Sequence, residues 1–347
     1  MRRGVRAAST LCAVALCNFV SPSEGTAQKI LPRESPGTRT ALLWRQPNNI
    51  PSRDLLHGVG GKENQPLGTF TFIKEDPGGA NPKFLVEDSR GRRWKVKLGP
   101  EAGVETTATR LLWAMGYFTD EDYFRREISV KGLKRLNRGQ EFVSANGTVR
   151  GARLERQLAD IKKAGHWSWR NNPFKGTREF HGLIVMMSLL NNWDLKTGNN
   201  DIYQNGQEYQ YLVSDVGAVF GNSNFWRRTK ADLKAYRKGK FLQEVSAEEI
   251  DLRLPTRPPC PFLFAFPFYI QRTRLAGLAE DMPRHHVEWI GQLLAQLSTQ
   301  QISDAFRAGG FESSELEGLT QEVQRRISEL RGLIAANRHE PGTALTR

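Results

Sequence analysis

The sequence lacks an apolar run long enough to cross a membrane, which takes about 20 residues. Its N-terminal apolar segment, Ala7–Val20, is shorter than that. Basic residues precede this segment, and small and polar residues follow it, ending in Gly25-Thr26-Ala27. This order is typical of an export signal. We expect residues 1–27 to form a signal peptide and the mature chain to be exported, to the periplasm, the envelope or the extracellular space, without a transmembrane span.

Cysteine is also scarce, with three residues in 347. Cys12 and Cys17 lie in the expected signal peptide, so cleavage would leave Cys260 alone. A single cysteine cannot form an internal disulfide, and stability must then come from packing. Leu16 occupies a position before Cys17 where a lipoprotein signal needs a small residue, so a lipid anchor at Cys17 is the less favoured alternative.

Acidic residues are too few to balance the basic ones. The 50 Lys and Arg exceed the 37 Asp and Glu, and the formal net charge is +13. A surface of this sign favours polyanions, nucleotide phosphates or an anionic membrane face. The sequence has no arginine-rich tract and no basic repeat interleaved with aromatic residues, which argues against specific nucleic-acid binding. The length suffices for one large domain or two modest ones with a hydrophobic core.

The most informative stretch begins with an apolar segment, Leu183–Leu190, which predicts a helix buried on most sides. A polar loop, Asn191–Asn200, follows it. Asn205-Gly206, the dipeptide preferred in a tight type I′ hairpin, then separates two β-rich runs. The hairpin reverses the chain and can bring Asp215 back beside the polar loop.

Three polar residues of this loop, Asp194, Lys196 and Asn199, would then lie near Asp215. Together they offer two carboxylates, an amide and an ammonium group. Phosphoryl transfer needs such a set: an Asp to orient the attacking hydroxyl, an Asn and an Asp to hold Mg²⁺, and a cation beside the moving phosphoryl group.

Two short motifs in this stretch resemble those of the protein-kinase superfamily. Asp194-Leu195-Lys196-Thr197-Gly198-Asn199 is similar to the D-L-K-x-x-N core of the kinase catalytic loop. Ser214-Asp215-Val216-Gly217 is similar to the metal-binding D-F-G motif, with Val in place of Phe. The resemblance covers roughly Thr69 to Gly221.

Strand patterns come before these motifs. Three alternating runs predict an antiparallel meander: Thr69–Glu75, Lys83–Asp88 and Trp94–Leu98. In a kinase-like fold the first turn, which holds Gly78 and Gly79 here, would cover the nucleotide phosphates with backbone amides, and the third strand would supply a lysine to the α- and β-phosphates. Lys95 and Lys97 share one face of that strand, and Lys97 is favoured because it lies nearer the following helix.

That helix is predicted to begin near Ala102 and to run to Met115. Glu105 lies in its first turn, where it is suited to pair with Lys97. Glu101 is the competing partner, although Pro100 favours a turn there. The sequence leaves the choice between the two glutamates open.

The resemblance implies an α+β fold of two lobes: a small antiparallel β lobe with one helix, and a larger, mainly helical lobe. We expect an extended lead-in over 28–66, the small lobe over 67–155, and the large lobe, with the catalytic loop and C-terminal helices, over 156–340. Further strands would complete the small lobe: Glu127–Val130, Gln140–Val143 and Thr148–Leu154. They lead to a hinge near Ala152–Glu155, whose backbone groups would bind adenine.

The chain also departs from the eukaryotic-type protein kinases. Its first hairpin turn lacks the G-x-G-x-x-G pattern, and Asn192-Trp193 stands where His-Arg would precede the catalytic Asp. No A-P-E-like segment follows Gly217. These departures favour the divergent kinase-like families, namely phosphatidylinositol kinases, bacterial toxin-type serine kinases and secretory-pathway kinases.

The resemblance implies an exported phosphotransferase that uses ATP with Mg²⁺ or Mn²⁺ to phosphorylate a hydroxyl acceptor. Asp194 would accept the hydroxyl proton, and Lys196 would lie beside the γ-phosphoryl group. Asn199 and Asp215 would hold the metal. Lys97 and the glycine turn described above would hold the other phosphates.

The sequence does not identify the acceptor. A basic run between Arg227 and Lys240 occupies the place where kinase-like folds dock substrate, which suits an anionic acceptor. ATP is scarce outside the cytoplasm, so the alternative is a pseudokinase, or a nucleotide- or ligand-binding envelope protein without catalysis. Whether the chain is an enzyme therefore stays open at this point.

Overall fold

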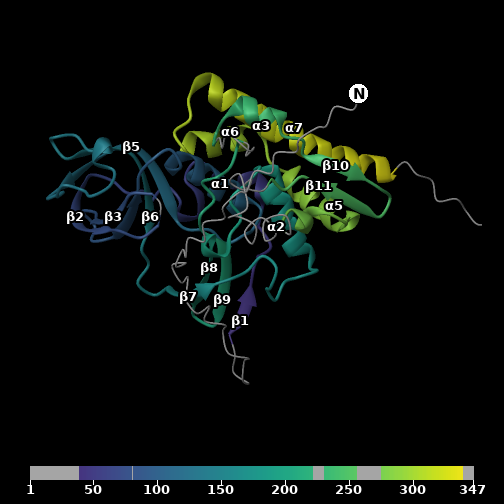
Figure 1. Ribbon diagram of the computed structural model, residues 1–347, viewed down its shortest axis with the longest axis horizontal. Coiled ribbons are helices and arrows are strands. Elements are labelled where there is room, and N and C mark those ends of the chain that lie inside the picture. The colour runs from purple at the N-terminus through teal and green to yellow at the C-terminus, as the bar shows by residue number, and fades with distance from the viewer. Residues whose placement is uncertain (1–38, 80, 222–229, 256–274, 339–347) are drawn as a thin grey trace, which may run out of the picture. The chain divides into compact units, whose positions relative to one another are not determined.

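The computed structural model describes residues 39–79, 81–221, 230–255 and 275–338 (Figure 1). These residues belong to one compact unit, Arg33–Arg347. The expected signal peptide, Cys17, Cys260 and the first part of the basic run lie outside the described residues.

Five strands form a closed barrel in the order β2-β3-β4-β6-β5. Their bounds are β2 Thr69–Asp76, β3 Lys83–Glu87, β4 Arg93–Lys97, β5 Asp122–Lys131 and β6 Thr148–Arg156. All neighbours pair antiparallel except β2 and β5, whose parallel pairing closes the barrel. The register aligns Lys97 with Lys83 on β3 and with Arg153 on β6, so the end of β4 has a neighbour on both sides.

One strand predicted from the sequence is absent from this barrel. The run Gln140–Val143 forms the 3₁₀ helix η3 (Gln140–Phe142) instead, and Val143 makes only an isolated bridge to Val149. The reason is local. Gly139 adopts the left-handed conformation (φ 84°), and the Gln140 side chain accepts a hydrogen bond from the Leu136 amide, which holds a turn there.

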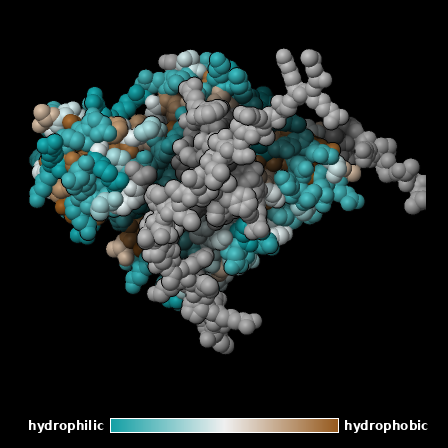
Figure 2. Space-filling model, viewed as in Figure 1, coloured by the Kyte–Doolittle hydropathy of each residue, from teal (hydrophilic) through white to brown (hydrophobic). Residues whose placement is uncertain are grey.

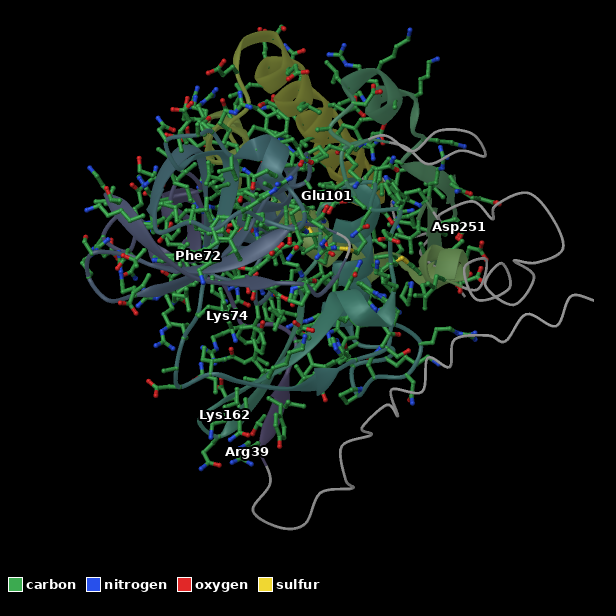
Figure 3. The ribbon with its side chains drawn as sticks, turned by 60° about the vertical axis from the view of Figure 1, so that its left-hand side comes forward. Arg39, Phe72, Lys74, Glu101, Lys162 and Asp251 are labelled. Carbon is green, nitrogen blue, oxygen red and sulfur yellow. The ribbon has the colours of Figure 1, made fainter. Side chains whose placement is uncertain are left out.

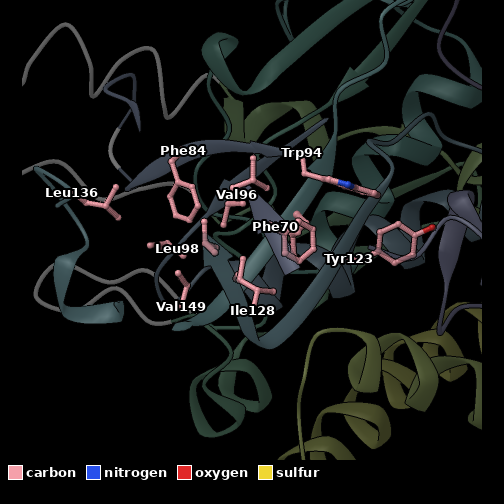
Figure 4. Close-up of a cluster of buried hydrophobic side chains, with 13 residues drawn as sticks. Phe70, Phe84, Trp94, Val96, Leu98, Tyr123, Ile128, Leu136 and Val149 are labelled. Atoms are coloured by element: carbon pink, nitrogen blue, oxygen red, sulfur yellow. The ribbon is translucent and has the colours of Figure 1, made fainter. Parts of the chain in front are cut away.

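The barrel interior holds a cluster of buried hydrophobic side chains (Figure 4). Alternate residues of each strand point inward, as with Phe84 and Val86 on β3 and Trp94 and Val96 on β4. All four are fully buried. This alternation in the sequence fixes the strand faces and places Lys95 and Lys97 on the opposite face from Val96.

Helix α1 (Ala102–Ala114) packs against β5 and β6 and also against helix α6 (Thr299–Ala308) (Figure 1). It is buried almost all round, including its polar residues Glu105 and Arg110. Because polar groups are rarely buried without partners, this helix must receive charged side chains from its neighbours.

The larger part of the chain contains two sheets. The first has the order β1-β9-β8-β7, with β1 Thr40–Leu42, β7 Lys162–His166, β8 Asn200–Asn205 and β9 Glu208–Val213. Strands β8 and β9 form the predicted hairpin around Gly206, whose φ of 57° suits the tight turn. The second sheet has the order β10-β11-β12, with β10 Leu242–Val245, β11 Glu249–Leu252 and β12 Met282–Pro283.

Helices complete this part: α2 Arg178–Leu189, α3 Leu233–Lys238, α5 Arg284–Leu294, α6 and α7 Ser313–Arg338. Helix α2 packs on α5, and α7 packs on α3, α5 and α6. Single-turn 3₁₀ helices lie at η1 Ile50–Ser52, η2 Gly58–Gly60, η4 Thr197–Asn199 and η6 Gly277–Ala279. The predicted α+β class, a small β part with one helix and a larger part rich in helices, is confirmed.

Among the described residues, no helix is both long and apolar enough to cross a membrane. Figure 2 shows that the described residues on this face are mostly hydrophilic, with hydrophobic ones in small groups.

Candidate active site

Lys97, the last residue of β4, lies at the centre of the candidate site. Its Nζ is 2.5 Å from Glu105 Oε2, 3.1 Å from Asp215 Oδ1 and 3.3 Å from Glu101 Oε2. The Lys97 side chain is 7% exposed and that of Glu105 is 2% exposed, so this pair is shielded from solvent. The structure therefore brings together residues from β4, from the start of α1 and from the segment after β9. Both glutamates considered from the sequence contact Lys97, and Glu105 is the nearer one.

Electrostatics keep Lys97 charged. Burial alone would lower the pKa of Lys97, but the carboxylates of Glu105 and Asp215 outweigh it, and the pKa is raised. Burial raises the pKa of Glu105, although Arg153 and Lys97 act in the opposite direction. For Asp215, burial is outweighed by Lys97, which lowers the pKa. An ammonium group and an ionised Asp215 carboxylate thus face each other.

The loop after α2 is held by its own side chains. The Asp194 amide donates to Asn192 Oδ1 at 3.0 Å, and Asn199 Nδ2 donates to the Asp194 carbonyl at 2.8 Å. Lys196 Nζ lies 3.1 Å from Asp194 Oδ2 and leaves 55% of its side chain exposed. Asn191, the first residue of the loop, has a φ of 55° and donates from its side chain to the Gly221 carbonyl. Asp194 is therefore fixed in position beside an exposed cation.

Asn199 and Asp215 are adjacent through the backbone. The Asn199 carbonyl accepts the amides of Ser214 at 2.8 Å and of Asp215 at 3.3 Å. Because the Asn199 amide nitrogen donates to Asp194, a metal would be held through its amide oxygen. The Asp215 side chain is 42% exposed, so its carboxylate is accessible to an ion. Two oxygen ligands fit Mg²⁺, which keeps several waters and takes phosphate oxygens as further ligands.

No group of three or more His, Cys, Asp or Glu side chains suited to a metal occurs in the part of the chain that the structure describes. A metal at Asn199 and Asp215 would therefore depend on ligands that the nucleotide brings.

The glycine turn between β2 and β3 lies at the end of the barrel that carries Lys97, since Asp76 pairs with Lys83 and Lys83 with Lys97. Two of its backbone groups already have partners. The Gly78 amide donates to Asp76 Oδ1 at 2.9 Å, and the Gly79 carbonyl accepts from Arg138 at 2.8 Å. The Gly78 amide would have to exchange this partner before it could bind a phosphate.

Glu101 has a larger part in the site than the sequence indicated. Labelled in Figure 3, it precedes α1 and accepts a 2.5 Å hydrogen bond from Asn81. It also pairs with Lys230. A Cβ on Gly217 would lie 2.8 Å from the Glu101 Cβ, so only glycine fits at that position. The signal in the sequence for the contact between Glu101 and Lys97 is that the two residues are only four positions apart.

Sequence reasoning missed a buried charge cluster under Lys97. Arg153, on β6, is 1% exposed and contacts Asp122 at 2.6 Å, Glu155 at 3.0 Å and Glu105 at 3.5 Å. Arg110 contacts Asp122 at 2.7 Å. Burial would lower the pKa of Arg153, but its surrounding carboxylates raise it well above its usual value. The cluster anchors Glu105, and no local pattern in the sequence indicates it.

A cavity of about 260 Å³ lies beside this cluster. Its lining includes Lys95 on β4, Glu155 to Leu158 at the end of β6, Tyr203 on β8 and Leu212 on β9. It therefore lies between the strand that ends in Lys97 and the hairpin that leads to Asp215.

Three kinds of comparison with known proteins were made: with family models, with curated sequences and with solved structures. No protein-family model matches this chain, and no curated protein sequence matches it either. Solved structures do match, and kinases are among them. The Helicobacter pylori proinflammatory kinase CtkA is 14% identical, with a TM-score of 0.46, over 80% of this chain and 100% of that one.

Two further similar structures are of the Golgi casein kinase. One is 12% identical, with a TM-score of 0.35, over 81% of this chain and 76% of that one. The other, with Mn/ADP bound, is 10% identical, with a TM-score of 0.33, over 81% of this chain and 75% of that one.

Proposed function

We propose that this protein is a kinase-like phosphotransferase that uses ATP with Mg²⁺ or Mn²⁺ to phosphorylate a hydroxyl acceptor. The observation that carries the proposal is the position of Lys97 Nζ, which lies 2.5 Å from Glu105 and 3.1 Å from Asp215. A strand lysine held by a helix glutamate, next to an aspartate that can hold metal, is the arrangement that positions nucleotide phosphates for transfer.

Each residue then has a role that its surroundings support. Lys97 would bind the α- and β-phosphates, and Asn199 and Asp215 would hold the metal, which supplies charge neutralisation to the phosphates. Asp194 would orient the acceptor hydroxyl and take its proton, because the loop fixes it in place. Lys196, exposed beside Asp194, would approach the γ-phosphoryl group.

Export and the acceptor are further parts of the proposal. Export rests on the N-terminal leader, and an anionic acceptor is supported by exposed basic residues on and after α3: Lys234, Arg237, Lys238 and Lys240. The same charges would attract any polyanion, so acceptor candidates of opposite charge must be compared directly.

A second candidate function is a pseudokinase that binds a nucleotide or another ligand without transferring phosphate. It is favoured by the glycine turn, whose Gly78 amide is bonded to Asp76 and whose Gly79 carbonyl is bonded to Arg138. A turn occupied in this way does not cover phosphates until it rearranges.

Calorimetric titration with Mg-ATP, followed by transfer assays with γ-labelled ATP on acidic and basic protein acceptors, tests both candidates. Transfer that disappears in Asp194→Asn while Mg-ATP still binds would support the phosphotransferase. Asp304→Asn is the matched control, because Asp304 contacts only Gln300 and Arg307 in its own helix among the described polar contacts. Saturable binding without transfer would favour the pseudokinase. Absence of Mg-ATP binding would exclude the phosphotransferase and a pseudokinase that binds this nucleotide.

A further inference from the structure

The cavity of about 260 Å³ lies beside the proposed phosphate site. Lys95 lines it and lies two residues before Lys97 on β4, a separation of about 7 Å along a strand. Leu212 lines it from β9, three residues before Asp215. Phosphates held at Lys97 and Asp215 would therefore direct the base into this cavity. Its volume is just below the roughly 300–1,000 Å³ of ligand pockets, which suits part of a nucleotide.

Asp120, between α1 and β5, lines this cavity with 6% of its side chain exposed. Its Oδ2 has no hydrogen-bond partner among the described residues, and its ion pair with Arg153 Nη2 spans 3.8 Å. The neighbouring Glu155, by contrast, contacts Lys95 at 2.5 Å and Arg153 at 3.0 Å. A buried polar atom without a hydrogen bond costs free energy. Because Asp120 Oδ2 lacks a hydrogen bond and lies beside a cavity, it indicates a ligand partner in that cavity.

The proton distribution in this acidic pair is uneven. Burial and the Glu155 carboxylate raise the pKa of Asp120 well above its usual range, while Arg153 and Lys95 act in the opposite direction. Burial would also raise the pKa of Glu155, but Lys95 and Arg153 lower it. The raised pKa of Asp120 favours its protonated form, and the lowered pKa of Glu155 favours its carboxylate.

We propose that Asp120 binds the edge of the nucleotide's purine base as a neutral carboxyl group, and so determines how strongly the base contributes to binding. This inference rests on the proposed ATP site. A neutral carboxyl group offers one O–H donor and one acceptor. Adenine presents an amino donor beside a ring-nitrogen acceptor, so both groups of Asp120 find a partner. An ionised carboxylate only accepts and leaves the ring nitrogen unpaired.

The test separates the base from the phosphates by titrating the full mature chain with Mg-ATP and with Mg-tripolyphosphate, which lacks a base. Asp120→Ala should weaken Mg-ATP about tenfold, the value of one or two neutral hydrogen bonds, and leave Mg-tripolyphosphate unchanged. Asp120→Asn, which retains a donor and an acceptor of similar shape, should bind Mg-ATP within about threefold of the wild type.

Each outcome decides something. Unchanged Mg-ATP affinity in Asp120→Ala, or an equal loss for both ligands, overturns the role of Asp120 while the phosphate site stands. If the wild-type chain binds neither ligand, the proposed function fails and this inference fails with it. Thermal unfolding of each variant shows whether it is folded.

A pH titration provides a second measurement should Asp120→Ala not fold. The ratio of Mg-ATP to Mg-tripolyphosphate affinity should fall in the wild type as the pH is raised above the usual range of an aspartate carboxyl, because Asp120 loses its proton, and it should stay constant in Asp120→Asn. The ionisable groups that act on Asp120 are the same in both proteins: Lys95, Asp122, Arg153, Glu155 and Tyr203. The other charged residues that line the cavity are also the same: Glu121, Arg156, Lys163 and Asp201. A fall of equal size in Asp120→Asn would overturn the proposal.

Discussion

Lys97 Nζ lies 2.5 Å from Glu105 Oε2, although the two residues belong to a barrel strand and to the helix that follows it. Glu101, the residue before α1, contacts the same nitrogen at 3.3 Å. The first pair is enclosed, with Glu105 2% exposed, whereas the Glu101 side chain is 13% exposed. A fully enclosed ion pair depends more strongly on each partner than an accessible one.

Glu105→Gln should therefore have a larger effect than Glu101→Gln. Removing one partner of a buried pair leaves the other charge uncompensated, and we expect the free energy of unfolding to fall by about 3 kcal/mol. Mg-ATP affinity should fall at least about tenfold, because Lys97 loses the partner that holds it towards α1. Urea unfolding and calorimetry measure the two effects. A larger loss in Glu101→Gln would show that Glu101 is the principal partner.

The sequence indicated that Lys97 and Asp215 meet, because Lys97 ends a predicted strand, Asp215 lies in a short motif, and the two follow one another in kinase order. It left open whether Glu101 or Glu105 pairs with Lys97. The roles of these residues stay predictions. Arg153 could not be foreseen in the same way. A charged residue on a strand normally indicates a solvent-exposed face, and Arg153 is buried only because carboxylates from α1, β5 and β6 surround it.

For the fold, too, local patterns were predictable and features that depend on the surroundings were not. Alternating apolar residues predicted β2 to β4 well because the pattern is local. Gln140–Val143 carries a strand-like composition, yet the left-handed Gly139 and the Gln140 side-chain hydrogen bond turn it into a 3₁₀ helix. These features depend on backbone conformations that composition does not reveal.

Metal dependence tests the position of Asp215. Chelation with EDTA should abolish ATP binding, since Asn199 and Asp215 offer oxygen ligands suited to Mg²⁺. Asp215→Asn should require at least about tenfold more Mg²⁺ for half-maximal ATP binding, because a charged ligand is lost. Mg²⁺ titration at fixed ATP measures this shift, with Asp304→Asn as control. ATP affinity that is insensitive to EDTA would contradict the assignment.

Arg326 supports the site from a distance. It is fully buried in α7 and donates to the carbonyls of Ser188 and Leu189 at the end of α2, and to those of Tyr236 and Gly239 around the end of α3. These distances lie between 2.8 and 3.3 Å. Arg326→Met should lower the free energy of unfolding by about 3–5 kcal/mol, since it leaves several buried acceptors unpaired.

Arg325 provides the matched control for this prediction. It is adjacent in sequence and contacts Glu322 at 2.7 Å, but its side chain is 46% exposed. Arg325→Met should therefore cost less than about 1 kcal/mol. Urea unfolding of the three proteins, compared at constant m-value, measures the difference. Equal losses in the two variants would show that Arg326 does not tie α7 to the end of α2.

Acid should destabilise the packing of α2 against α5 through a histidine pair. His181 Nδ1 lies 2.7 Å from His286 Nδ1, a distance at which one ring donates and the other must accept. Burial lowers the pKa of both imidazoles, and His285 adds to the effect. Glu179 and Arg178 also act on His286, in opposite directions.

The two histidines therefore bind fewer protons in the folded protein than in the unfolded chain, where they titrate at about pH 6.5. The stabilisation from the neutral histidine pair is complete above about pH 6.5. It is lost as the pH falls below that value and through the lowered pKa values of the folded state. His286→Gln should show a shallower decline in thermal unfolding temperature between about pH 7 and 5 than the wild type, because the pair can no longer titrate together. Identical pH profiles would mean that both rings titrate freely and that their contact does not contribute to stability.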